Sequence, residues 1–564
     1  MGAGPVISPA VKANSPVEKP RLNWKLKPPH DKVAQGLVVS GFDDLPCAEA
    51  LFLFFEWPEN GPGGPNVRGK GGWLQSLHAV AAITDADKPE PKTAALAFTW
   101  TGLQKMGLGK DALATFSAPF REGMYQEDRL RRLGDMISGQ WQETVIKEGS
   151  RWSANIPALK AKAAGEGPIA EMGGPPELQE REVLTPITVH ALLVLYESDT
   201  ERLDKWRKEV EATLNRANVK VVHQLSLDLH LDKNGIGREH FGFADGLSQP
   251  IPFGDKGRDE IADDCVILRD GSTAKRDPWH GVPLGEILLG HINAHHEKAP
   301  APFVQDNDDA RAAGLSTVGA PEGFRSLGLD GSYMVVRELR QYVAAFWQSL
   351  EAAAEKIRAH DPKGPPITAD WLAERIIGRN LDGHLLCPES QYPSGYLPPD
   401  KDDNNFAQNA FGFLKTDPHG VGCPLGSHVR RGNPRDSLAK DLASAQTLLD
   451  AANNHRILRR GRKFGRLPPA NRLDDDKQER GLLFVCLNTD IARQFEFVQQ
   501  NWILNRNFAT LYDETDPLIG PKGQFTIPED PLRRTIEVET FIQLAGGEYF
   551  FLPSIPAINY LAAL

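Results

Sequence analysis

The feature that most constrains the fold is an order of strand and helix that occurs in both halves of the sequence. In the amino-terminal half, the apolar run HALLVLYES (190–198) predicts a buried strand, and an amphipathic helix follows it. The apolar stripe of that helix consists of Leu203, Trp206, Val210 and Leu214. In the carboxyl-terminal half, GSYMVVREL (331–339) and GLLFVCLN (481–488) each precede a similar helix. The sequence shows no sustained Rossmann-type alternation of strands and helices. The strand–helix units therefore favour an α+β protein with two similar antiparallel-sheet halves.

Local patterns predict further elements. Strands are expected at 33–42, 49–57 and 219–231 and a helix from about Gly72, and residues 94–109 are expected to form a strand followed by a short helix. Ser198 and Glu201 match a capping box at the start of the helix that carries the Leu203 stripe. Residues 110–185 are polar and include a Gly/Pro-rich stretch, which indicates a surface insertion.

The 564 residues are expected to form two domains behind a tail. Residues 1–30 are a proline-rich extended tail, 31–235 the first domain and 236–564 the second. The amino terminus has no apolar core and no twin arginine, so no secretory signal is expected and the cytoplasm is the default location. No apolar run reaches the roughly 20 residues of a membrane-spanning helix.

Charge and cysteine usage exclude several classes of function. The net charge of −11 argues against nucleic-acid backbones and anionic membranes as partners. Five scattered cysteines without CxxC or CxxCH exclude a disulfide scaffold, a thiolate zinc site and covalently attached haem.

Two motifs suggest a ligand but are better explained otherwise. GPNVRGK (64–70) resembles a phosphate loop, yet Gly71 stands where a hydroxyl should bind magnesium, so a glycine-rich turn is expected. His291 and His295, four residues apart, could share a metal on a helix, and His296 lies beside them. The segment lacks the HExxH order and a third spaced ligand, so a solvated loop is expected.

Three segments carry the chemistry. In HFGFADGLSQP (240–250), glycines on both sides place Asp245 on a tight turn, where it either faces a ligand or only caps the turn. CPLGSHVRRGNPRD (423–436) holds one histidine and three arginines, and HRILRRGRKFG (455–465) is a second basic cluster. Two dense basic segments in an acidic chain indicate a local site for a carboxylate-bearing ligand.

Together these segments resemble the dye-decolorising peroxidases, a haem family, and the match is closest to the large bacterial subclass. FGFADG is similar to the family's GxxDG signature, SHVRRGNPR to its proximal-histidine segment and ILRRG to its distal-arginine segment. GEILLG, GSYMVVREL and RGLLFVCLNTDIARQFEFVQQNW follow the family's order, so the resemblance covers roughly 30–560. It implies two ferredoxin-like domains, each an antiparallel sheet with peripheral helices, as in dimeric α+β barrels, with insertions at about 110–185, 255–280 and 350–410.

The resemblance also implies the residues of a site for non-covalently bound haem b. His428 would be the axial iron ligand, and Asp516 would accept a hydrogen bond from its other ring nitrogen. Asp513 and Glu496 remain alternatives to Asp516. Arg435 would pair with a haem propionate, and Arg430 and Arg431 are the alternatives for that role.

On the opposite face, the resemblance assigns acid–base work on hydrogen peroxide to Asp245 and stabilisation of the departing charge to Arg459. His240 could line an access channel or be structural. Trp502 and Tyr512 are candidates for relaying electrons from bulky donors, although the apolar stripe around Trp502 favours core packing.

The expected function is therefore a haem peroxidase with H₂O₂ and organic reductants such as dyes and phenolics as its partners, working through an oxoferryl intermediate and one-electron steps. A haem-binding or haem-handling protein with little turnover is the alternative, since a fold alone does not guarantee activity. A homo-oligomer is compatible with either function.

Overall fold

A computed structural model provides the three-dimensional structure. It describes residues 24–57, 70–87, 91–154, 187–232, 235–253, 265–268, 273–275, 279–306, 310–387, 411–529 and 533–564. Most of the expected tail, nearly all of the GPNVRGK motif and the Gly/Pro-rich stretch after residue 154 lie outside the described residues. Among the helices of the described ranges, none is both long enough and apolar enough to cross a membrane.

The centre of the molecule is a closed ring of antiparallel strands. Its amino-half strands, in spatial order, are β3 (Thr93–Phe98), β8 (Ala191–Glu197), β2 (Cys47–Phe55) and β9 (Val219–Asp228). Its carboxyl-half strands are β22 (Ile542–Leu552), β16 (Ser332–Gln341), β19 (Arg480–Asn488) and β18 (Arg462–Gly465), with β17 (Leu458–Arg459) also beside β19. The halves meet twice, where β9 pairs with β18 and where β22 pairs with β3. This topology confirms the expected α+β barrel of two similar halves.

Both faces of these strands are apolar. Along β22, Phe550 and Phe551 belong to different core clusters, as do Val335 and Val336 along β16, because successive side chains point to opposite faces of a sheet. Inside the ring, His223 of β9 approaches Glu338 of β16 to 2.8 Å, although these strands are not sheet neighbours. Burial on both faces explains why the strands read as continuous apolar runs rather than as alternating patterns.

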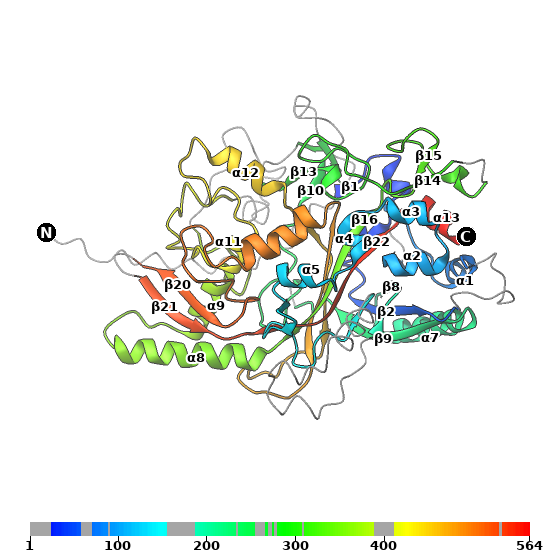
Figure 1. The fold of residues 1–564 in the computed structure, drawn as a ribbon. Coiled ribbons are helices and arrows are strands. Elements are labelled where there is room, and N and C mark those ends of the chain that lie inside the picture. Colours follow the sequence, from blue (N-terminus) through cyan, green and yellow to red (C-terminus); the bar gives the residue numbers. More distant parts are fainter. Residues whose placement is uncertain are drawn as a thin grey trace.

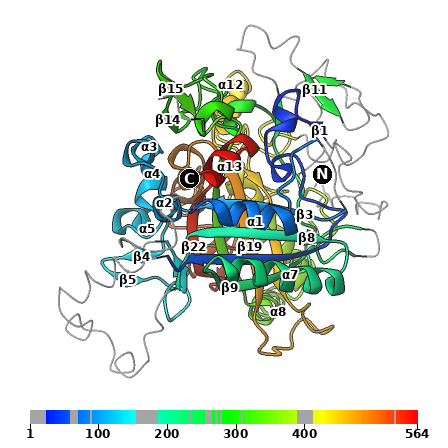
Figure 2. The same ribbon diagram turned by 90° about the vertical axis from the view of Figure 1, so that its right-hand side faces the viewer.

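Helices cover the outer face of the ring. α1 (Gly72–Val80), α7 (Thr200–Arg216) and the carboxyl-terminal α13 (Ile555–Ala562) pack on the amino-half strands, and α8 (Val343–His360) and α9 (Ala369–Ile377) lie at the other end of the molecule (Figures 1 and 2). Since α13 ends the chain yet packs on the amino half, one apolar cluster contains residues of both halves. The division into domains at residue 235 stays a prediction.

Shorter elements complete the described part of the chain. The remaining α-helices are α2 (Trp100–Met106), α3 (Lys110–Ala114), α4 (Ala118–Glu122), α5 (Glu127–Arg132), α11 (His428–Gly432) and α12 (Ala445–Asn453). The 3₁₀ helices are η1 (His30–Lys32), η2 (Gly36–Val38), η6 (Leu284–Glu286) and η7 (Ala312–Gly314). Two π-helical segments are η8 (Ala492–Glu496) and η9 (Val498–Ile503). The remaining strands are β1 (Trp24–Lys25), β4 (Met136–Ile137), β5 (Gln140–Trp141), β6 (Trp152–Ser153), β7 (Ile187–Thr188), β10 (Ile251–Phe253), β11 (Cys265–Leu268), β12 (Thr273–Lys275), β13 (Gly281–Pro283), β14 (Phe303–Gln305), β15 (Phe324–Ser326), β20 (Gly523–Pro528) and β21 (Arg533–Val538).

The expected strand at 33–42 is wrong. This region belongs to a segment, residues 30–46, that we call the strap, and it contains η1 and η2 instead of a strand. Six of its carbonyl groups accept hydrogen bonds from arginine side chains instead of taking part in a strand ladder. Arg460 donates to the carbonyls of Leu37 and Val38, and Arg462 donates to those of Gly41, Phe42, Leu45 and Pro46.

Two smaller expectations also need correction. The capping box of Ser198 and Glu201 is wrong, because Asp199 caps α7 by accepting a hydrogen bond from the amide of Arg202. The first part of the expected polar insertion, residues 110–154, contributes to the core, where the buried rings of Phe116 and Phe120 pack on Phe551 of β22 and Tyr333 of β16.

Candidate functional site

The side chain of His428 stands at the start of α11 and is held by one carboxylate. Its Nδ1 lies 2.9 Å from Oδ2 of Asp516. The side chain is 32 % exposed, and among the described residues no protein group bonds to Nε2. A histidine held in this way presents Nε2 as a free ligand atom with a fixed ring orientation.

Asp516 is itself fixed on both oxygens. Oδ1 accepts the backbone amides of Leu518 and Ile519, while Oδ2 faces His428. Burial raises the pKa of Asp516, but the charge and hydrogen bond of His428 and the Ile519 amide lower it, so that the net pKa lies below its ordinary value. The carboxylate is therefore charged and accepts the Nδ1 proton of His428.

The other two acids considered for this role lie elsewhere. Asp513 is exposed and pairs with Arg506 at 2.6 Å. Glu496 is buried and accepts hydrogen bonds from Arg129 and from the hydroxyl of Tyr549. Of the three, Asp516 is the one that contacts His428.

The two arginines that follow His428 anchor α11. Arg431 donates to the carbonyls of Trp502, Ile503, Asn505 and Glu514, which include the end of η9. Arg430 donates to the carbonyls of Asp417 and Cys423 and to the hydroxyl of Ser437. Both guanidinium groups are fully buried among protein acceptors, which explains how a helix of five residues holds its position.

A second group of charges surrounds Asp245. Its turn needs the left-handed φ of +78° at Gly246, whose amide donates to Oδ1 of Asp245 at 2.6 Å. Arg459 Nη1 lies 3.9 Å from Oδ1, and Lys463 Nζ lies 3.8 Å from Oδ2. The two cations come from β17 and β18, which pair with β19 in one continuous register on either side of Arg460 and Gly461.

The cations keep Asp245 ionised. Burial raises the pKa of Asp245, whereas the charges of Lys463 and Arg459 and the Gly246 amide lower it, and the net pKa lies below the ordinary value. Nearby, burial raises the pKa of Glu239 to about 7, although the backbone amides of Phe241 and Phe243 donate hydrogen bonds to its carboxylate and act to lower the pKa. Glu239 thus shapes the turn that precedes Asp245.

Arg459 is also bonded to the backbone and side chains of the turn. Its Nη2 donates to the carbonyl of Leu247 at 2.8 Å, and its amide donates to Oε1 of Gln249 at 3.1 Å. The β17–β18 segment that carries the cations and the loop that carries Asp245 are therefore joined by hydrogen bonds.

Arg435 connects the histidine segment to the Asp245 loop. Its Nη2 donates to Oγ of Ser248 at 3.0 Å, and its guanidinium stacks on the ring of Phe411 at 3.7 Å and bonds to the carbonyl of the same residue. The backbone of Arg435 has φ of +51°, which non-glycine residues rarely adopt. The pairing of Arg435 with a propionate stays a prediction.

His240 has a structural environment. It is buried, its Nε2 donates to the carbonyl of Phe464, and its ring contacts that of His230 edge-on. Burial lowers the pKa of His240 to about 4. These contacts favour the structural interpretation over a channel residue.

The two electron-relay candidates differ in exposure. Trp502 is buried against His455 and Phe497, in agreement with core packing, whereas Tyr512 is largely exposed. The electron-relay role stays a prediction for both.

The sequence analysis missed Lys463 and Gln249 as parts of this site. Lys463 is 3 % exposed, and a buried lysine needs a nearby acceptor. Its spacing of four residues from Arg459 is the signal that could have placed both cations on one face of an extended segment, because side chains alternate between the two faces of a strand.

The histidine cluster at 291–296 is only in part the solvated loop that we expected. His295 and His296 are exposed, but His291 is buried and bonds to Asp330. The expectation of a solvated side chain at His291 is therefore wrong, because Asp330, 39 residues later, folds back onto it.

The residues present fit a haem. An imidazole with Nδ1 bound and Nε2 free is the donor that a haem iron takes from a proximal histidine. An ionised carboxylate beside two cations is suited to binding and deprotonating a small polar oxidant. Ser248, bonded to Arg435, follows Asp245 by three residues, so the histidine segment and the carboxylate loop belong to one region.

Curated proteins that are similar to this chain carry the names of dye peroxidases. No family model matches the chain. The multifunctional dye peroxidase of an Amycolatopsis species is 29 % identical over 428 residues, covering 72 % of this chain and 78 % of that protein. The dye-decolorizing peroxidase msp1 of Mycetinis scorodonius is 27 % identical and covers 66 % of each.

Solved structures share the fold over almost the whole chain. The DyP-type peroxidase of an Anabaena species superposes with a TM-score of 0.62 at 22 % identity, over 96 % of this chain and 99 % of that one. A variant of the Auricularia auricula-judae enzyme superposes with a TM-score of 0.63 at 18 % identity, over 95 % and 99 %.

Proposed function

Because the chain belongs to the dye-decolorizing peroxidase family, we propose that it binds haem b without a covalent link and uses H₂O₂ to oxidise organic donors such as dyes and phenolics. The observation that carries this proposal is the ionised Asp245 with Arg459 at 3.9 Å. Simple haem storage needs an axial histidine and propionate partners, but it has no need of an acid–base group beside a cation.

His428 would hold the haem iron through Nε2, while Asp516 keeps the proton on Nδ1 and fixes the ring. When bound, the haem would supply a centre that gives two electrons to peroxide and regains them one at a time from organic donors. The negative charge of Asp516 makes the imidazole a stronger donor and favours the more oxidised states of the iron.

Asp245 is the group that moves the proton. Its carboxylate accepts a proton from one oxygen of H₂O₂ and returns it to the other oxygen, which then leaves as water. This cycle requires the charged form of Asp245 at the start, and the depressed pKa provides it at neutral and mildly acidic pH.

Arg459 and Lys463 stabilise the charge that develops as the oxygen–oxygen bond breaks. Both are preorganised, Arg459 by Leu247 and Gln249 and Lys463 by its burial, so they need no rearrangement during the reaction. Arg435, seven residues after His428, would bind a haem propionate at the edge of the same site.

Spectroscopy and rapid mixing test the proposal. Purified protein titrated with hemin should give a Soret band at one haem per chain, and His428→Ala should lose this ligation. In stopped-flow mixing with H₂O₂, Asp245→Asn and Arg459→Leu should keep the haem but slow the first spectral change by at least about 100-fold, the lower limit typical of acid–base groups.

The exposed Asp513→Asn is the matched control and should react like the parent protein. If both distal variants react with peroxide at the parent rate, the assigned roles are wrong and the protein binds haem for another purpose. If no Soret band forms, haem binding itself is refuted.

A further inference from the structure

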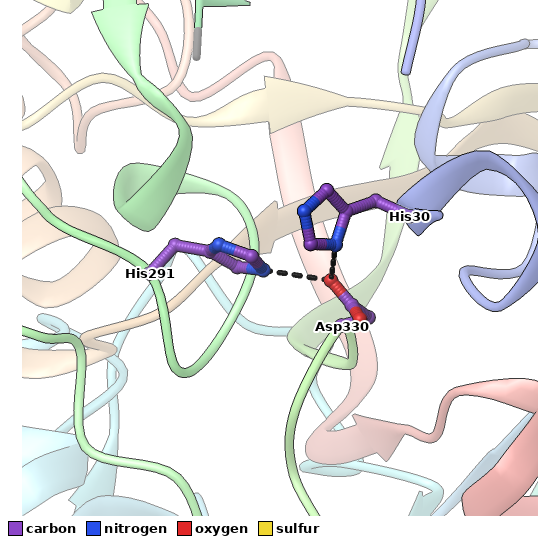
Figure 3. Close-up of side chains that lie close together, drawn as sticks. All are labelled: His30, His291 and Asp330. Atoms are coloured by element: carbon purple, nitrogen blue, oxygen red, sulfur yellow. Dashed lines mark hydrogen bonds and ion pairs between the residues drawn. The ribbon is translucent and has the colours of Figure 1, made fainter. Parts of the chain in front are cut away.

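A second group of possible ligands lies away from the proposed haem site. Nδ1 of His30 is 2.8 Å and Nε2 of His291 is 2.7 Å from the same oxygen, Oδ1 of Asp330, and the three ligand atoms lie within 4.8 Å of one another (Figure 3). His30 belongs to η1 of the strap, His291 to the loop after η6, and Asp330 to the turn before β16. Three segments distant in sequence therefore converge on one point.

The arrangement of these three side chains resembles a metal site more than an ordinary ion pair. Two neighbouring imidazoles approach a single carboxylate oxygen, and their rings meet edge-on with centroids 4.6 Å apart. His291 and Asp330 are buried, whereas His30 is 25 % exposed and leaves a path for an ion and a water ligand. With neutral imidazoles the cluster carries one negative charge, which favours a divalent cation.

We propose that His30, His291 and Asp330 form a binding site for a zinc ion, with water as the fourth ligand. Two imidazoles and one carboxylate are donors that zinc accepts in tetrahedral geometry. Calcium and magnesium prefer oxygen donors, and manganese binds nitrogen donors more weakly than zinc does.

Binding requires a tautomer change but no net loss of protons. Without zinc, each ring donates an N–H to Asp330. To bind zinc, the same nitrogens must offer lone pairs, so the protons move to Nε2 of His30 and Nδ1 of His291. Tetrahedral zinc at about 2.1 Å from each ligand separates the ligand atoms by about 3.4 Å, so Oδ1 withdraws by roughly 0.6–0.7 Å from each nitrogen.

The ion would fix the strap to the body of the protein. His30 begins the strap, whose carbonyls accept hydrogen bonds from Arg460 and Arg462, and these arginines lie between Arg459 and Lys463 along the β17–β18 segment. Zinc would thus add a cross-link between the amino-terminal segment and the half of the barrel that carries the peroxide chemistry.

Metal analysis of the full-length haem protein tests this site. The protein is treated with a chelator, dialysed against micromolar Zn²⁺, and its zinc and iron contents are measured separately. We expect one zinc per chain, and the melting temperature should rise on zinc addition because the ion binds the folded state.

The variant His30→Gln separates a metal site from a hydrogen-bonded clamp, since glutamine still donates to Asp330 but is a poor zinc ligand. It should lose the zinc and the thermal shift, while the exposed His295→Gln should keep both. Zinc content in His30→Gln equal to that of the parent protein would overturn the site. So would a parent protein that binds no zinc, or one that prefers Mn²⁺ in the same dialysis.

Discussion

At the scale of single residues, the protonation of Asp245 depends on cations that approach both of its oxygens. Lys463 is the stronger of the two influences that lower the pKa of Asp245, and Arg459 is the next. Because the folded-state pKa lies below its ordinary value, the carboxylate stays charged as the pH falls and is protonated only in strong acid. The reaction with peroxide should therefore be lost only in strong acid.

The substitution Lys463→Met should move this limit. Without the lysine charge, burial dominates and the pKa of Asp245 rises, so the acidic limb of the rate of reaction with H₂O₂ should shift to higher pH. The rate constant measured by stopped flow between pH 3 and 8 checks this. Lys477→Met, at a side chain that is 83 % exposed, is the control, and a profile identical for both variants would contradict the role of Lys463.

Asp516→Asn should weaken the iron ligand without removing it. The amide cannot provide a negative acceptor for Nδ1 of His428, and loss of such a partner typically costs about 10–100-fold in metal affinity or activity. We expect faster haem release and a more positive Fe(III)/Fe(II) potential, measured by haem transfer to apomyoglobin and by redox titration. An unchanged potential would show that Asp516 does not act through His428.

At the scale of elements, α11 is positioned by what its arginines bind rather than by its own length. Arg431→Met leaves several buried carbonyls without a donor, and each unsatisfied buried group costs about 1–3 kcal/mol. We therefore expect a loss of at least about 3 kcal/mol in the free energy of unfolding, measured by urea denaturation. The exposed Arg506→Met should change it by less than about 0.5 kcal/mol.

Elements defined by local patterns could be predicted, and elements defined by distant partners could not. β8, β16 and β19 are buried on both faces, so their apolar runs identify them. The strap has β-forming residues, but two arginines more than 400 residues away take its carbonyls. Likewise, both Ser198 and Asp199 can cap a helix, and the sequence pattern alone did not decide between them.

The residues of the candidate site divide in the same way, into those that local sequence patterns identify and those that only the fold brings together. Asp245, His428 and Arg459 lie in segments that resemble a known family, so their positions were expected. Lys463 could not be placed, because its proximity to Asp245 depends on how the β17–β18 segment packs on the loop. His291 was misjudged for the corresponding reason, since its partners His30 and Asp330 are distant in sequence.

At the scale of the whole molecule, the two halves share one core. Leu193 of β8 and Val335 of β16 belong to the same apolar cluster, although they lie in different halves. The amino half should therefore not unfold while the carboxyl half remains folded.

Leu193→Ala tests this coupling. The buried truncation should cost about 2–5 kcal/mol, and it should lower the urea midpoint reported by the haem Soret band, although Leu193 lies in the half that does not carry His428. The exposed Leu442→Ala is the control. A Soret midpoint that stays constant while tryptophan fluorescence shifts would mean that the halves unfold separately.

The strap has a practical consequence for engineering the protein. Its carbonyls accept hydrogen bonds from Arg460 and Arg462, which lie between the two peroxide-facing cations along the β17–β18 segment. A protease site inserted between the strap and β2 would divide the chain into a short peptide and a large fragment. Peroxide turnover would then depend on whether the two pieces are together, which is the requirement for a split-enzyme reporter.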